Sequence, residues 1–218
     1  RDRAMLSASR RVSGGHDWAL RPGFRYLYEA DRFTAVAGTQ PGLFPDDREF
    51  HGLLGEVEWV RPRFILDRRL DKMGRMEEID LGTSLRAGAG LAPARAATGL
   101  LTLNLSQGAG RRGGPYLLAT AESSSRIESG RARQAVFTGR LAGYDRIAER
   151  QTLVAAVTWK SGWNLYRDSQ FLLGGESGLR GYPARQFSGD RSLLAAVEDR
   201  VTLADNVLSI FSFGLAVF

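Results

Sequence analysis

Residues 79–89, IDLGTSLRAGA, alternate between apolar and polar side chains with a period of two. Successive side chains of an extended chain point to opposite faces, so this pattern predicts a strand with one apolar and one polar face. The apolar face would carry Ile79, Leu81, Leu85, Ala87 and Ala89, and the other face Asp80, Gly82, Ser84, Arg86 and Gly88.

The same alternation recurs along the chain and predicts an all-β fold of roughly ten strands. Each would have about ten residues, the length that a tilted strand needs to cross a bilayer. A soluble sandwich would also alternate, so alternation alone leaves both environments open. The alternation is clear at 18–29, 101–106 and 211–217, and weaker at 3–12, 53–66, 116–127, 134–147, 153–163 and 192–203.

The connections between these strands fall into a short class and a long class. Antiparallel strands alternate ends, and outer-membrane barrels have short periplasmic turns and longer outer loops. The two longest connections, 30–52 and 164–191, would lie at the same end, as this topology predicts. Residues 67–78 do not fit, because they are long but lie on the short side. Either that turn is extended or one strand is misplaced. The other connections are 13–16, 111–115, 149–151 and 204–206 on the short side, and 91–98 and 128–133 on the long side.

The longest connection, together with the strand after it, reads QFLLGGESGLRGYPARQFSGDRSLLAAVEDR (170–200). It is too long for a hairpin connector, and loops of this length are usually functional or disordered. Its aromatic and apolar side chains argue against disorder. We therefore expect an ordered functional loop, with Leu179-Arg180-Gly181-Tyr182 inside it.

Three segments of this region resemble the C-terminal barrel of the bacterial surface antigen superfamily. They are Phe-Leu-Leu-Gly-Gly (171–175), Leu-Arg-Gly-Tyr (179–182) and Leu-Leu-Ala-Ala-Val-Glu-Asp-Arg (193–200). That superfamily includes the outer-membrane β-barrel assembly factor, the translocation and assembly factor, and the two-partner secretion (haemolysin activator) transporters. The resemblance implies a barrel of about sixteen strands, within the range known for outer-membrane barrels. It also implies that the loop folds back into the lumen and gates it.

The resemblance makes Arg180 the residue on which gating depends, because the corresponding arginine packs against the inner barrel wall and pairs with acidic residues there. A buried guanidinium needs such a partner. Glu198 and Arg200 share the inward parity of their strand, and Glu198 is the candidate partner for Arg180 within the chain. The tandem glycines would let the backbone turn inward without a side-chain clash. The expected loop motif is Gly174, Gly175, Leu179, Arg180, Gly181 and Tyr182, with Glu198 and Arg200 as ion-pair candidates.

Other chemistries find little support in the sequence. There are no cysteines, no apolar run approaches the roughly 20 residues of a membrane-spanning helix, and no acidic cluster has metal-ligand spacing. The serine of Gly-Glu-Ser-Gly (175–178) is not centred as in a nucleophile elbow, and His16 and His51 lie far from any candidate nucleophile. The net charge of +6 comes from arginines that alternate along strands, unlike a nucleic-acid-binding tract. We expect no enzyme activity, no cofactor and no nucleic-acid partner.

We therefore expect residues 1–218 to be a C-terminal outer-membrane β-barrel domain, excised at both ends, with a lumen-folding loop at 164–191. Its expected place is the bacterial outer membrane. Its expected function is outer-membrane protein assembly and insertion, or polypeptide translocation. The partners would be outer-membrane lipids, an unfolded client polypeptide, and periplasmic chaperones or lipoprotein subunits. Two alternatives remain: a passive porin-like or structural barrel, and a soluble β-barrel that binds an anionic ligand.

Overall fold

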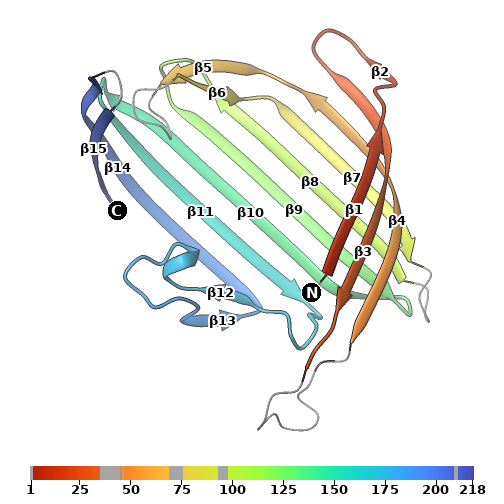
Figure 1. Cartoon of the computed structure of the whole chain (residues 1–218). Helices are drawn as coiled ribbons and strands as arrows, with labels where there is room; N and C mark the ends of the chain where they lie inside the picture. Colours follow the sequence, from red (N-terminus) through yellow and green to blue (C-terminus); the bar gives the residue numbers. More distant parts are fainter. Residues whose placement is uncertain (1, 35–44, 46, 69–75, 93–97, 209–210) are drawn as a thin grey trace.

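The computed structural model describes residues 2–34, 45, 47–68, 76–92, 98–208 and 211–218. It confirms an all-β fold, in which eleven strands form one antiparallel sheet in the order β1-β3-β4-β7-β8-β9-β10-β11-β14-β15, with β2 paired to β3 (Figure 1). The strands are β1 (Asp2–Ser9), β2 (Ser13–Gly14), β3 (Ala19–Asp31), β4 (Arg48–Arg61), β7 (Thr83–Ala92), β8 (Thr98–Gly110), β9 (Tyr116–Glu128), β10 (Arg131–Ala148), β11 (Gln151–Trp163), β14 (Arg191–Val207) and β15 (Phe211–Val217).

The sheet is strongly curled but is not closed into a barrel. Strands β1 and β15 form its two edges and, within the described ranges, do not pair with each other. An ion pair of 2.5 Å between Glu29 on β3 and Arg126 on β9 demonstrates the curl. Three strands separate β3 from β9, so a flat sheet would hold their backbones about 19 Å apart. The face that carries Glu29 and Arg126 is therefore concave.

Two adjacent rows of directly paired residues show how different the two faces are. Each row crosses β3, β4, β7, β8, β9, β10, β11 and β14. The row on the concave face is Arg21, Glu58, Arg86, Asn104, Glu122, Thr138, Lys160 and Ser192, and the row on the convex face is Leu20, Trp59, Leu85, Leu105, Ala121, Gly139, Trp159 and Leu193.

Large apolar side chains are exposed along the whole convex face. Antiparallel pairing in register brings residues of one parity together on each face, so the alternation of each strand adds up across the sheet. The exposed apolar residues of this face include Phe24, Leu53, Val57, Leu91, Leu101, Leu103, Leu117, Leu141, Leu153, Val157, Leu193, Val197, Leu215 and Val217.

The segment 79–89 is not one strand, and this prediction is wrong. The structure has β6 (Met76–Asp80), a bend at Leu81–Gly82, and then β7. Leu85 faces outward as expected, but Ile79 and Leu81 are buried in a core cluster on the concave face. The bend turns the chain inward because the Asp80 carboxylate accepts the Gly82 amide at 2.7 Å. A sequence can keep its alternation through such a bend while the faces exchange.

The expected turn at 67–78 is described only at its two ends, where residues 64–68 and 76–80 are strands. β5 (Phe64–Arg68) pairs with β6 in a separate two-stranded sheet that continues beyond β4 and β7. The tip of this hairpin lies outside the described residues. Figure 1 shows β5 and β6 running along the end of the sheet that carries the short turns. The hairpin packs on the inner face of β9–β11 through a core cluster made of Ile79, Leu81, Tyr116, Ala142, Tyr144 and Val154, with Ile65, Leu118 and Ala156 against it.

A buried carboxylate latches this hairpin to the sheet. Asp67 accepts hydrogen bonds from the Tyr116 hydroxyl, the Gly113 amide at 2.8 Å and the Arg146 guanidinium at 2.5 Å. Burial raises the pKa of Asp67, but the bonds from Tyr116 and Arg146 lower it more, and the net pKa lies well below the usual range of an aspartate. The charged form is therefore the one that the latch stabilises.

Asp67→Asn should weaken the latch, because an amide cannot accept these three donors as a carboxylate does. Breaking one side of a buried pair costs about 3–5 kcal/mol, and we expect a loss of that order in unfolding free energy, measured by denaturant unfolding in detergent micelles. Glu78→Gln, an exposed change on the same hairpin, is the control and should have almost no effect. Since the folded pKa is depressed, the stabilisation should be complete at neutral pH and disappear only as the pH falls below the usual aspartate range. Equal stabilities of the two variants would contradict the latch.

Candidate functional site

The connection between β11 and β14 is an ordered loop on the concave face. It contains β12 (Phe171–Leu173), a 3-10 turn η1 (Gly175–Ser177) and β13 (Phe187–Gly189), with β12 and β13 paired antiparallel. A Cβ added at Gly178 would lie 2.7 Å from the side chain of Leu194, a concave-face residue of β14. The loop therefore runs along the inner surface of the sheet near β14 (Figure 1).

The tandem glycines allow two limbs of the loop to pass at backbone contact. A Cβ at Gly174 would lie 2.4 Å from the Pro183 carbonyl oxygen, and one at Gly175 would lie 2.7 Å from that of Tyr182. The Gly175 amide donates to Pro183 at 3.2 Å. Glycine is thus required here by close approach within the loop.

The Leu-Arg-Gly-Tyr segment (179–182) forms a turn within the same loop. The Tyr182 amide donates to the Leu179 carbonyl at 3.2 Å, and Gly181 between them has a φ of +88°, which favours glycine. The Tyr182 ring lies 5.6 Å from that of Phe187. Arg180 at the turn is exposed.

The direct ion pair between Arg180 and Glu198 is not formed. The Arg180 guanidinium lies 3.6 Å from the centre of the Phe218 ring, a cation–π contact. Glu198 pairs with Arg200 at 3.2 Å, and Arg180 is within electrostatic range of it. Glu198 and Arg200 are two positions apart on one strand and project to the same side, so Arg200 reaches the carboxylate first.

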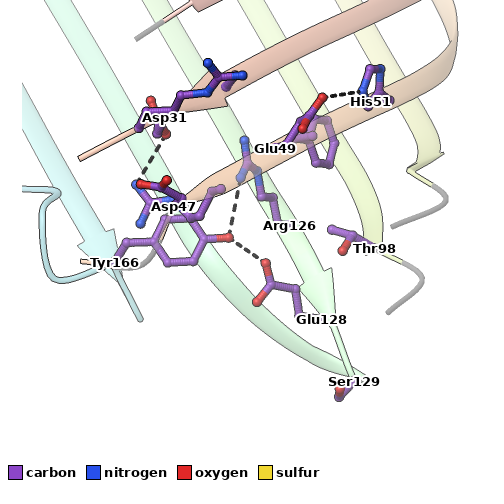
Figure 2. A pocket seen from close by; sticks show the side chains of 13 residues that line it. Asp31, Asp47, Glu49, His51, Thr98, Arg126, Glu128, Ser129 and Tyr166 are labelled. Atoms are coloured by element: carbon purple, nitrogen blue, oxygen red, sulfur yellow. Dashed lines mark hydrogen bonds and ion pairs between the residues drawn. The ribbon is translucent and has the colours of Figure 1, made fainter. Parts of the chain in front are cut away.

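A second set of contacts, which the sequence did not indicate, holds the first turn of the loop. Figure 2 shows the Tyr166 hydroxyl between Arg126 and Glu128 on β9. Tyr166 donates to Glu128 at 2.5 Å and accepts from Arg126 at 3.4 Å. Burial raises the pKa of Tyr166, and so does the bond to Glu128. At neutral pH the phenol therefore stays protonated and can act as the donor.

Arg48 on β4 ties the same turn to the opposite side of the concave face. Its guanidinium donates to both oxygens of Asp168, at 2.7 Å and 2.6 Å, and lies 3.3 Å from Asp31. It also lies 4.4 Å from the centre of the Tyr166 ring. A two-pronged contact of this kind fixes orientation as well as distance. The loop base thus spans the concave face from β11 to β4.

A bulge in β10 fixes where the loop leaves the sheet. The register between β10 and β9 shifts between Arg133 and Val136, and Gln134 at this point has a φ of 47°. Its side chain accepts the Tyr166 amide at 2.9 Å and donates to Ser169 at 2.9 Å. Bulges commonly re-aim a side chain in this way.

These contacts line a pocket of about 910 Å³ at the long-loop end of the concave face. Both signs of charge are present in it, with Arg48 and Arg126 paired as described and the Glu49 carboxylate 3.1 Å from His51. Further ion pairs continue along the concave face, including Arg25–Glu56 at 3.0 Å and Arg86–Glu58 at 2.6 Å. The arrangement provides a charged surface with hydrogen-bonding groups.

Comparison with known proteins assigns this chain to no family. No protein-family model matches the chain, and no curated protein matches it. Within the described ranges, no group of three or more His, Asp or Glu side chains could hold a metal ion. The same ranges contain no helix long and apolar enough to span a membrane.

Arg48→Ala should release the loop base, because it leaves Asp168 and Asp31 without this cation. The pair is partly exposed, so we expect a cost of about 1–2 kcal/mol, less than for a fully buried pair. Amide exchange in residues 164–169 should then become about tenfold faster. Arg32→Ala is the matched control, since Arg32 lines the same pocket and is exposed. Unchanged exchange in the Arg48 variant would show that the base is held by other contacts.

Proposed function

We propose that this chain forms the wall of a transmembrane β-barrel of the bacterial outer membrane that inserts or translocates polypeptides. The observation that carries the membrane part is the apolar row beside the charged row across the curled sheet. A soluble sheet buries its apolar face and wets its polar face. Here the apolar convex face is exposed, and the charged residues gather on the concave side.

A lipid bilayer outside the sheet and water inside it would together account for this arrangement of side chains. Apolar side chains on the convex face would contact lipid at no cost, whereas in water such an area promotes association. In hydrocarbon every backbone polar group must be paired, and a continuous ladder provides this across all inner strands. Charged residues on a lipid face are destabilising, so a water-filled concave side is the place for the arginines. The proposal includes the closure of the curled sheet into a complete barrel.

The loop from β11 to β14 supports the polypeptide-handling part. It resembles the gating loop of the bacterial surface antigen superfamily at Leu-Arg-Gly-Tyr (179–182), and it lies on the concave face. No covalent chemistry is needed for this work. A client can be accommodated by a polar lumen or by pairing with a strand edge. A loop held on the inner wall would control access to either.

Cysteine accessibility in membranes tests the orientation of the two faces. In intact vesicles, Leu85→Cys and Phe213→Cys should be shielded from a membrane-impermeant thiol reagent, because both side chains are on the convex face. Ser84→Cys, one residue along on the concave face, should be labelled. The test would go against a membrane barrel if the convex positions reacted as fast as Ser84→Cys.

Arg180→Ala should impair client delivery more than barrel folding. Arg180 is exposed, so loss of the contact with Phe218 removes about 0.5–1 kcal/mol of cation–π interaction, which would lower the ratio of docked to free loop tip about two- to fivefold. The ladder does not involve this contact, so heat-modifiability should be unchanged. Arg180→Lys should restore activity in part, since an ammonium lacks the planar guanidinium. Arg185→Ala, an exposed arginine in the same loop, is the control. Full delivery by Arg180→Ala at wild-type abundance would end the gating proposal.

A further inference from the structure

A polar pocket of about 390 Å³ lies on the inner side of the sheet at its short-turn end, beside the Asp67 latch. The β5–β6 hairpin lines it on one side with Arg68 and Met76. Arg112 of the β8–β9 turn and Glu149, directly after β10, line it on the other side. The pocket is therefore a seam between the hairpin and the sheet.

The latch brings two arginines together across this seam. The Asp67 carboxylate accepts the Gly113 amide at 2.8 Å. Arg68 follows Asp67 in the chain, and Arg112 precedes Gly113. Both arginine side chains are exposed, and both line the pocket. The fold thus holds two cations at one cavity through a contact between their neighbours in the chain.

Most of the donors on these two guanidinium groups are available to a ligand. The Arg68 Nε donates to the Met76 sulfur at 3.0 Å, and a thioether is only a weak acceptor. Among the residues that the structure describes, the Arg112 side chain makes no hydrogen bond or ion pair. Arg146 differs from both, because it donates to Asp67 at 2.5 Å as part of the latch.

The charges around the pocket favour an anion with a single negative charge. Three arginines and two carboxylates line it. Arg146 and Asp67 neutralise each other, which leaves Arg68 and Arg112 facing Glu149. A monoanion would complete the balance, whereas a dianion would place excess negative charge beside Glu149. A carboxylate is the monoanion whose geometry matches the planar guanidinium fork.

We propose that this pocket binds a carboxylate of an extended polypeptide, an inference that rests on the proposed function for its source of the carboxylate. Arg68 and Arg112 would donate to the carboxylate oxygens, and the exposed Met76 side chain would contact the adjoining hydrocarbon. A lipid would lie against the apolar convex face instead. A client that reaches the concave face from the short-turn end would pass this pocket, and it carries carboxylates at its C-terminus and on acidic side chains.

Titration with short peptides tests the need for a carboxylate. The full-length protein in dodecyl maltoside, a nonionic detergent, would be titrated by calorimetry with a neutral, N-acetylated peptide. The peptide would have a free C-terminus, a C-terminal amide, or the amide together with one internal glutamate. We expect the plain amide to bind about tenfold more weakly than the better of the other two, because it loses hydrogen bonds to charged groups. The tighter of those two identifies the source, and equal binding of all three would overturn the site.

Substitution of the two arginines tests where the carboxylate binds. Arg112→Ala and Arg68→Ala should each weaken the carboxylate peptide about tenfold and leave the plain amide unchanged. Arg112→Lys should retain part of the affinity, since an ammonium lacks the planar fork. Arg111→Ala is the matched control, because Arg111 is exposed in the same turn but does not line the pocket. An equal loss in the Arg111 and Arg112 variants would contradict the site.

Competition by small anions tests the charge and the polypeptide source. Acetate should displace the peptide more effectively than the same concentration of inorganic phosphate, which is mostly a dianion above neutral pH. Stronger displacement by phosphate would overturn the carboxylate assignment. Acetate that binds as tightly as the peptide would show that the polypeptide chain adds nothing, and would overturn the polypeptide assignment.

Insertion into vesicles separates this inference from the proposed function. A protein that inserts and delivers clients, but binds all three peptides equally, would overturn the pocket assignment alone. A protein that binds the carboxylate peptide through Arg112 but does not insert would overturn the proposed function alone.

Discussion

The register of the antiparallel ladder is the constraint on which the rest of the structure depends. Leu85 lies opposite Leu105 and Arg86 opposite Asn104, and each pair continues into a row across the sheet. A slip of one residue at any interface would exchange the faces of every strand beyond it. The contrast between the convex and concave faces therefore exists only because all registers agree. The same register places oppositely charged side chains of neighbouring strands close enough to form ion pairs.

The concave face depends on pairs that bridge non-adjacent strands as well as neighbours. Glu29 on β3 accepts from Arg126 on β9, with three strands between them, and Arg48 reaches Asp168 in the loop. Such contacts need the curl, and they reinforce it in return, since a flatter sheet would leave these charges apart. At the other end, the Asp67 latch draws the β5–β6 hairpin inward. Different elements therefore lie over the two ends of the concave face. At the short-turn end it is the β5–β6 hairpin, and at the other end it is the base of the loop between β11 and β14.

Local alternation was enough to predict the strands and their faces, because it is a property of each strand alone. It failed where a single residue changes direction. The bend at Leu81–Gly82 preserves the alternation while it reverses the faces, and the bulge at Gln134 has no signature in an otherwise regular strand. The roles of Asp67 and Tyr166 depend on partners 49 and 38 residues away, which no local pattern contains. For Arg180, the resemblance implied a pair with Glu198, but it could not show that Arg200 on the same strand pairs with that carboxylate.

The loop is held far more firmly at its base than at its tip, and this difference bears on how it could gate. Tyr166 and Asp168 at the base make charge-assisted hydrogen bonds to β9 and β4, each of which is roughly twice as strong as a neutral one. Arg180 at the tip has a cation–π contact with Phe218 and a longer-range interaction with Glu198. A perturbation of modest energy would therefore free the tip while the base stays docked. In such a motion the paired strands β12 and β13 would move away from β14 with the tip, without any change in the ladder.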